Sequence, residues 1–328
     1  MKNLKRSIFI SFFVLIILVI LYFFISLLPS RRKNVNFYFN VSAPIKSIEV
    51  LKAGEEPFSI LRAEDDRFEI SGLKGVPLDF NLCGIVFNFM KNVPAEHVFM
   101  PKEAQDAYGD VSFSFKVCDL NDNKYVLNIY KKTADGGSYY CKKAGVNELA
   151  VVSFKDVEPI LNSKLSYVDR KLFSQYNKTF GDDGLCNGDG VKSCVVNRKN
   201  LNAPLKFEVD ESGSVLYLGS GDFKITEDVK KSVENAPSLL VADSVFCVKP
   251  SEEDFKNCGL KEPLASIEYV IDYKNYVINI GNVAKAEQLP SYKENSNELN
   301  ILKYYYVYVS GLDVIYVVDE NSLPWLKF

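Results

Sequence analysis

The strongest constraint on the fold of this chain is an internal repeat, because four short segments of the first half return in the same order in the second half. The segment Asn123–Ile129 (NKYVLNI) returns at 274–280 as KNYVINI. The remaining matches are Ala95–Phe99 with Ala242–Phe246, Tyr108-Gly109 with Cys258-Gly259, and Tyr139-Tyr140 plus Gly145 with Tyr305-Tyr306 plus Gly311. Four matches in a fixed order indicate a duplicated domain. A residue that both copies share serves the architecture, whereas a residue found in one copy is free to serve a particular function.

Composition fits two globular domains. The chain has 328 residues, of which 47% are hydrophobic and 25% charged, so a folded body rather than a disordered one is expected. The 19 tyrosines and 23 phenylalanines favour strands with aromatic cross-strand pairs. The net charge of −3 comes without a basic stripe, which argues against a nucleic-acid partner.

The N-terminal segment predicts a membrane anchor. Ile8 to Leu28 is an uncharged apolar run, and about 20 such residues span a bilayer as a helix. A cleavable signal peptide is the alternative, but its apolar region is usually shorter and ends in an Ala-x-Ala-like site. No such site precedes Arg31, so an uncleaved anchor is favoured. No second long apolar run exists, and the bilayer is therefore a predicted partner of a single-pass protein.

Charge alone does not orient the anchor. Lys2, Lys5 and Arg6 precede the run, and 31–33 (RRK) follows it, which is nearly a tie under the positive-inside rule. The very short lead predicts that the N-terminus stays in the cytoplasm and that the large body is exported.

The pattern of strands and helices predicts an α+β fold of two tandem duplicated domains, each a mainly antiparallel sheet with one or two helices, after one transmembrane helix. Helices are expected at 79–91 and 101–107 in the first copy, and from 227 and at 250–256 in the second. The second copy is expected to open with strands at 205–209, 214–218 and 222–225, with 177–202 as a loop insertion. The predicted domains are 1–33 (lead and anchor), 34–162 (first repeat), 163–204 (connector and Gly/Asp-rich loop) and 205–328 (second repeat).

The seven cysteines bear on the compartment, because disulfides persist where conditions are oxidising. No Cys-x-x-Cys pair and only one histidine occur, which argues against a zinc site. Candidate disulfides join cysteines that flank a loop, a short helix or neighbouring strands: Cys186 with Cys194, Cys247 with Cys258, and Cys118 with Cys141. Cys83 is then left as a buried thiol in an apolar helix. The alternative is that all seven are reduced and pack as small hydrophobic side chains.

Candidate catalytic groups do not form a constellation. His97 is the only histidine, and Ser244 stands at its place in the second copy, so a surface role is favoured over a base or a metal ligand. The stretch 181–190 (GDDGLCNGDG) is similar to a calcium loop, but Leu185 and Val196 stand where an EF-hand needs its first and last ligands. The acidic groups 64–66 and 252–254 lie in a turn and a helix's first turn. The sequence therefore predicts no catalytic, cofactor or metal site.

Aromatic residues near the C-terminus are candidate partner contacts. Tyr304 and Tyr306 lie in a tyrosine-rich strand, and Trp325 is the only tryptophan. Trp325 either plugs the core of the second copy or belongs to an apolar contact patch, and core packing is the favoured interpretation.

The sequence resembles a bacterial family, the domain of unknown function 4340, whose members accompany ABC-transporter components of the gliding-motility type. The motifs that carry the resemblance are the basic lead with one span, the strand Asp222–Ile225, the Ala-Asp/Glu-x-Val-Phe segment, the turn Gly259–Pro263, the strand end Ile280-Gly281, the strand Tyr304–Val307, the closing strand Val314–Val318 and the connector Val168–Leu172. The first copy departs from this pattern, because Tyr108-Gly109 is not followed by Leu and Pro. The resemblance implies no catalytic residues.

Together these features predict an inner-membrane protein with a periplasmic body that acts as a non-enzymatic scaffold or accessory subunit. The resemblance implies an ABC-transporter-linked assembly, and other membrane or envelope proteins are the expected partners. Exposed sheet edges give a physical route to such binding, because a partner strand can add to them. The alternatives are a module that binds an envelope glycan or small ligand between the repeats, and an envelope hydrolase, for which no constellation speaks.

Overall fold

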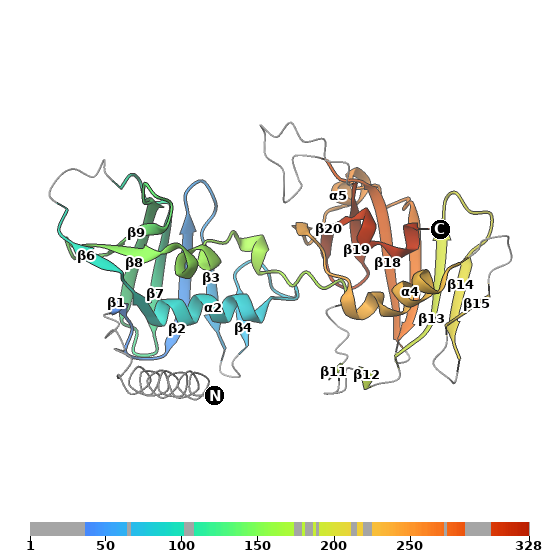
Figure 1. Ribbon diagram of the computed structural model, residues 1–328, viewed down its shortest axis with the longest axis horizontal. Helices are drawn as coiled ribbons and strands as arrows, with labels where there is room; N and C mark the ends of the chain where they lie inside the picture. The colour runs from blue at the N-terminus through green and yellow to red at the C-terminus, as the bar shows by residue number, and fades with distance from the viewer. Residues whose placement is uncertain are drawn as a thin grey trace, which may run out of the picture.

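The computed structural model of the chain describes residues 37–63, 67–101, 108–173, 179–180, 186–187, 190–210, 215–218, 225–271, 274–285 and 303–327. These residues form two units side by side, and in each unit a helix runs across one face of a sheet (Figure 1). The predicted span Ile8–Leu28 lies outside the described residues. Within them, no helix is both long and apolar enough to cross a bilayer.

Each unit is built on an eight-stranded sheet whose neighbouring strands are all antiparallel. The first sheet has the order β4 (Phe68–Ile70), β3 (Phe58–Arg62), β2 (Ile45–Lys52), β7 (Phe113–Asp119), β8 (Lys124–Lys132), β9 (Ser138–Lys143), β10 (Leu149–Ser153) and β6 (His97–Phe99). The second has the order β15 (Val215–Tyr217), β14 (Leu205–Val209), β13 (Val191–Arg198), β17 (Ala265–Ile271), β18 (Lys274–Val283), β19 (Tyr304–Val309), β20 (Val314–Asp319) and β16 (Ser244–Val248). The predicted tandem antiparallel α+β domains are confirmed.

The two sheets agree in register as well as in order. Ile129 faces Cys141 across β8 and β9, and Ile280 faces Val307 across β18 and β19. A bulge follows in both copies, after which Lys132 faces Tyr139 and Val283 faces Tyr305. The matches found in the sequence therefore mark equivalent places in two copies of one fold.

One strand contradicts the predicted loop insertion at 177–202. Val191–Arg198 forms β13, which lies between β14 and β17 inside the second sheet. Cys194 and Val196 alternate inward along it and are buried, as a strand with one face on the core requires. The Gly- and Asp-rich residues before β13 masked this alternation.

The position of β13 shifts the assignment of the opening strands by one. Because β13 corresponds to β2, the strand Leu205–Val209 corresponds to β3, and Val215–Tyr217 corresponds to β4. The third expected opening strand, 222–225, is therefore not the counterpart of β4, and 222–224 lie outside the described residues. A boundary at 205 would divide the second sheet, so the second repeat begins earlier.

The connector between the repeats belongs to the second fold. In the first repeat, β1 (Phe37–Asn40) pairs with β5 (Asn92–Pro94), just after the helix. In the second repeat, Lys171 bridges to Val241 at the same place. Phe39 packs edge-on against Tyr125, and Phe173 packs at a tilt against Tyr276, with ring centroids 6.1 and 5.9 Å apart. Residues 170–173 therefore take the role of β1.

The connector is hydrogen-bonded to both repeats. On the first-repeat side, the Asp79 amide donates to the Tyr167 carbonyl (2.8 Å) and the Asp169 amide to the Pro77 carbonyl (2.9 Å). On the second-repeat side, the Ala242 amide donates to the Arg170 carbonyl (2.8 Å). Because Tyr167 and Asp169 are bonded to the first repeat and Arg170 to the second, the connector is an ordered segment rather than a flexible linker.

The three longer helices, α2, α4 and α5, begin within two residues of where the sequence predicts. The structure has α2 (Phe80–Lys91), α3 (Phe154–Val157), α4 (Glu227–Leu239), α5 (Glu252–Asn257) and the short 3-10 helices η2 (Glu158–Ile160), η3 (Lys164–Tyr167), η5 (Glu320–Ser322) and η6 (Pro324–Leu326). The Asp79 and Thr226 side chains cap α2 and α4, and Ser251 and Asp254 form a capping box at α5. The helix expected at 101–107 lies almost entirely outside the described residues. The short strands β11 (Thr179–Phe180) and β12 (Cys186–Asn187) pair with each other, and the residues between them, 181–185, lie outside the described residues, as do 286–302.

Candidate functional site

The aromatic residues predicted as partner contacts lie mostly in the interior. Trp325 is fully buried, Tyr306 is buried beneath the second sheet's outer covering, and Tyr304 is half-buried. Tyr306 packs against Phe246 with ring centroids 5.0 Å apart. Trp325 therefore plugs the core of the second repeat, and Tyr306 offers little surface to a partner in this structure.

Trp325 belongs to a buried polar network that repairs a helix. Pro237 lies inside α4 and has no amide hydrogen to donate to the carbonyl of Val233 one turn earlier. The Tyr269 hydroxyl donates to that carbonyl (2.7 Å) and accepts from Trp325 Nε1 (2.8 Å). The network explains why β17 and the C-terminal turn η6 each carry a large side chain with a polar group, Tyr269 and Trp325.

None of the three predicted disulfides is formed. Six cysteine side chains are described, and all six are free thiols: Cys83, Cys118, Cys141, Cys194, Cys247 and Cys258. Cys118 on β7 and Cys141 on β9 are separated by β8, and two strand spacings of about 4.8 Å exceed the reach of a disulfide. Cys194 is buried in the core of the second repeat.

The buried thiols are poor nucleophiles. Burial raises the pKa of the Cys194 thiol to about 12 and that of Cys258 to about 11. Burial also raises the pKa of Cys247 to about 12, with the Asp254 charge adding to the effect. At neutral pH these side chains are neutral thiols, and a thiolate is what catalysis or metal binding needs.

The other chemical candidates of the sequence stay apart. His97 is exposed on β6, and Asp254 is used in the capping box of α5. Within the described part of the chain, no three His, Cys, Asp or Glu side chains are placed to hold a metal ion. The acidic turn 64–66 and most of the Gly/Asp-rich stretch 181–190 lie outside the described residues.

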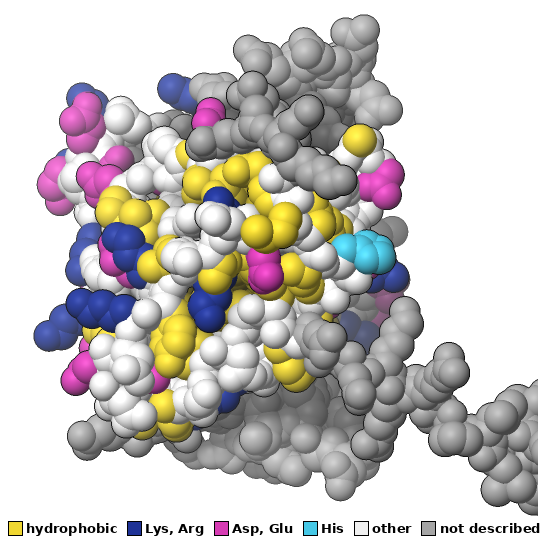
Figure 2. Space-filling view, turned by 90° about the vertical axis from the view of Figure 1, so that its left-hand side faces the viewer, with side chains coloured by type: hydrophobic (Ala, Val, Ile, Leu, Met, Phe, Trp, Pro, Cys, Tyr) yellow, Lys and Arg dark blue, Asp and Glu magenta, His cyan; other side chains and the backbone are white. Residues whose placement is uncertain are grey.

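The edge strand β6 is the most exposed apolar segment of the first repeat. Val98, Phe99 and Met100 are 47, 41 and 60% exposed, and Val98 and Phe99 point to opposite faces of the strand. Among the described strands, β6 pairs only with β10, so its outer edge has no strand partner there. Figure 2 shows this end of the molecule, where hydrophobic side chains gather beside the single histidine. Three consecutive apolar residues in an edge position were the sequence signal for this surface.

The equivalent edge strand of the second repeat is covered. Every residue of β16 is half-buried, because Phe246 and Cys247 pack into the cluster that α5 closes. Phe255 of α5 packs edge-on against Tyr308 at 4.8 Å between ring centroids. The first repeat's η3 also lies beside β16. The same strand therefore serves an internal interface in one copy and is open in the other.

The segment that follows the predicted anchor leads to the open edge. The Tyr38 hydroxyl donates to the Glu148 carbonyl (2.8 Å) and accepts from the Lys143 amide (3.1 Å). Glu148 precedes Leu149, which faces Phe99 across β10 and β6. Phe37 is exposed on the same strand as Tyr38, so β1 and β6 form one apolar end of the first repeat.

A second surface feature is a groove between the repeats. Its volume is about 460 Å³, and residues of both repeats line it, among them Asp79, Ser166, Arg170 and Ser244. Arg170 Nη1 donates to the Asp243 carbonyl (3.0 Å), which ties the groove wall to the connector. The remaining lining residues carry no aromatic ring: Leu82, Pro159, Asn162, Leu165, Asp243 and Val245.

Comparison of the whole chain with family models, with curated proteins and with solved structures finds no match.

Proposed function

We propose that the protein is a membrane-anchored, non-enzymatic envelope scaffold that binds a partner protein along the open edge strand β6. The observation that carries the proposal is the contrast between β6, with three consecutive exposed apolar residues, and β16, whose equivalent residues are covered. An exposed apolar edge strand is a template for addition of a partner's strand. A protein that keeps such an edge as a monomer risks aggregation, which a dedicated partner would prevent.

The proposed anchor supports a partner in or near the membrane. Phe37 follows Leu28 by nine positions, so β1 begins at most about 30 Å along the chain from the proposed span. Because β1 pairs with β5 and β6 begins three residues after β5, the proposed anchor would tether the open edge near the bilayer of the inner membrane. The resemblance to the domain of unknown function 4340 points to an ABC-transporter-linked assembly as the partner.

The test is crosslinking from position 98 in membranes with the full chain. A photoreactive residue in place of Val98 is expected to form a discrete crosslink to a transporter subunit, and the same residue in place of Leu216 is the matched control. Leu216 is also exposed, at 45%, but lies on the edge strand β15 of the second repeat. A pattern that is the same from both positions contradicts the proposal.

The variant Val98→Lys gives an independent readout. Lysine on an edge strand opposes strand addition, so recovery of the partner with Val98→Lys is expected to fall at least tenfold. Because Val98 is exposed, the free energy of unfolding is expected to change by less than about 0.5 kcal/mol. Undiminished recovery with a folded variant would place the partner contact elsewhere.

A small polar ligand in the groove between the repeats is the second candidate function. The groove brings hydroxyl, amide, carboxylate and guanidinium groups from both repeats together, which suits a small polar molecule. The lack of an aromatic ring among its lining residues disfavours a stacked sugar. Methyl signals of Leu82, Leu165 and Val245 are expected to shift on ligand addition, and unchanged signals with envelope sugars would argue against the glycan form.

A further inference from the structure

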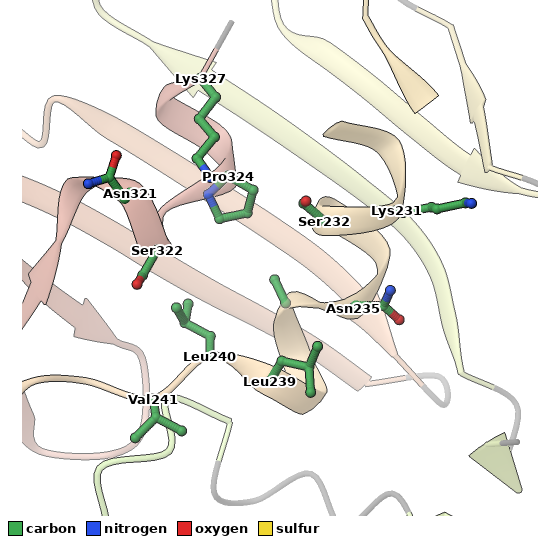
Figure 3. Close-up of a pocket in the computed structure, with 11 residues that line it drawn as sticks. Lys231, Ser232, Asn235, Leu239, Leu240, Val241, Asn321, Ser322, Pro324 and Lys327 are labelled. Atoms are coloured by element: carbon green, nitrogen blue, oxygen red, sulfur yellow. The ribbon is translucent and has the colours of Figure 1, made fainter. Parts of the chain in front are cut away.

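A groove in the second repeat lies between α4 and the C-terminal turns. Its volume is about 380 Å³, within the range of small-molecule sites. In Figure 3, Leu239, Leu240, Ser322 and Pro324 surround its open centre, and Lys327 runs back toward Pro324. Lys231 and Asn235 point away from the centre in the same view, so they contribute less to it.

The comparison of the repeats explains why the groove exists. Phe80 and Glu227 begin α2 and α4, and they are 147 positions apart, as are His97 and Ser244 on the edge strands. Within this ungapped stretch, Phe89 of the first repeat corresponds to Ala236 of the second. Phe89 packs against the first core, whereas Ala236 leaves its ring's space empty and lines the groove.

The other wall differs in the same way. His97 faces Val151 and Ser244 faces Val317, so these two valines are equivalent and 166 positions apart. The same spacing relates Leu161 to Lys327. Leu161 packs against the core of the first repeat, and Lys327 is exposed and lines the groove. Phe89 and Leu161, which pack against the core of the first repeat, are thus replaced in the second repeat by Ala236 and Lys327, which line an open groove.

The lining has one charge sign. Its cations are Lys231 and Lys327, its neutral polar groups are Ser232, Asn235, Asn321 and Ser322, and its apolar groups are Ala236, Leu239, Leu240, Val241 and Pro324. No carboxylate is among these lining residues. Leu239 is 69% exposed, which leaves its apolar surface in water unless something covers it.

We infer that this groove binds a small apolar carboxylate, whose ring or branched alkyl group takes the space of the missing Phe89 ring and whose carboxylate pairs with Lys327. The apolar group of the ligand would cover Leu239 and Ala236, and this burial gives the affinity. Because the charged lining residues, Lys231 and Lys327, are both cations, the groove prefers an anion. A free acid and the C-terminal residue of an apolar peptide present the same chemistry. The inference does not depend on the proposed function of β6.

The test uses the full chain in nanodiscs of uncharged lipid, with labelled leucine and valine methyl groups. The probe is 3-phenylpropionate, and 3-phenylpropanamide is its neutral match. The acid is expected to shift the methyl signals of Leu239, Leu240 and Val241 and to leave those of Val98 in place. A second arm uses N-acetyl-alanyl-phenylalanine. Tighter binding of this peptide than of the free acid identifies a peptide C-terminus, and the reverse identifies a free acid.

Three variants separate the parts of the site. Ala236→Phe restores the first repeat's filling and is expected to abolish binding. Lys327→Gln is expected to weaken the acid about fivefold, the size of an exposed ion pair, without changing the amide. Leu239→Ser lies on the surface, cannot prevent folding, and is expected to weaken both probes. Unshifted methyl signals at millimolar acid, equal affinity for acid and amide, or binding retained by Ala236→Phe would each overturn the inference.

Discussion

The two repeats share a strand order but differ in how their last edge strand is covered and in how the space beside their helix is packed. Both have eight antiparallel strands in the same spatial order, and both have a helix on one face of the sheet. The first repeat fills its core with apolar side chains and leaves β6 open. The second repeat covers β16, opens a groove at Ala236 and places a hydroxyl network at Tyr269. The common parts are required by the fold, and the differing parts are the places for particular functions.

The largest expected effect tests whether the connector is part of the second core. Phe173→Ala leaves a cavity and is expected to cost about 3 to 5 kcal/mol of the second repeat's free energy of unfolding. Trp325 is the only tryptophan, so urea unfolding followed by its fluorescence reports on that repeat. The matched variant Phe39→Ala should weaken the first repeat equally.

The variants Phe173→Ala and Phe39→Ala together also measure how strongly the unfolding of one repeat is coupled to that of the other. If Phe39→Ala leaves the Trp325 transition unchanged, the two repeats unfold separately. An equal shift would show that the hydrogen-bonded connector makes them one cooperative unit. No shift with Phe173→Ala would break the equivalence of the connector and β1.

The next largest effect concerns the network of the second repeat. Tyr269→Phe leaves the Val233 carbonyl and Trp325 Nε1 buried without partners, which is expected to cost about 2 to 4 kcal/mol. Tyr167→Phe is the control, because the Tyr167 hydroxyl is buried and makes no hydrogen bond to the described residues. Its loss should change the free energy of unfolding by less than about 0.5 kcal/mol or raise it.

Urea midpoints from circular dichroism and Trp325 fluorescence decide the comparison. Equal destabilisation by the two variants would show that the hydrogen bonds of the Tyr269 hydroxyl contribute nothing beyond the packing of a buried hydroxyl group. A large effect confined to Tyr269→Phe would confirm that the hydroxyl compensates for Pro237.

The smallest effect is a pH dependence in the first repeat alone. Burial by itself raises the pKa of the Asp119 carboxyl, but hydrogen bonds from Asn123, Asn121 and Tyr125 together hold that pKa below its ordinary value. Because the folded pKa is lowered, the carboxylate stabilises the β7–β8 turn above the ordinary aspartate value and loses this contribution as the pH falls through the folded pKa. Ile271 stands at the equivalent place in β17.

Amide chemical shifts follow this titration directly. The Asn121 and Asn123 amide signals should titrate with a midpoint below the ordinary aspartate pKa of about 3.9. Asp119→Asn should remove the transition. A midpoint at or above the ordinary value would show that burial outweighs the hydrogen bonds.

Local signals located many elements but not their neighbours. The repeated segment Asn123–Ile129 falls in β8 from Lys124 onward, and the helices expected at 79–91 and 250–256 are present as α2 and α5. The strand β13 was missed, because its neighbours in sequence are a polar loop and its pairing partner β17 lies about 70 residues away. Burial of Trp325 depends on Tyr269 and Pro237, which no local pattern links to it.

The sequence by itself determined that this chain is a duplicated, strand-rich α+β body, because alternation and turn residues act over a few positions and recur in order. Only the tertiary structure decided that β6 is open while β16 is covered, and that Trp325 is interior. It also decided that Ala236 opens a groove where Phe89 fills one. These outcomes depend on which distant segment packs against a strand or helix, and that choice is made by the whole chain when it folds.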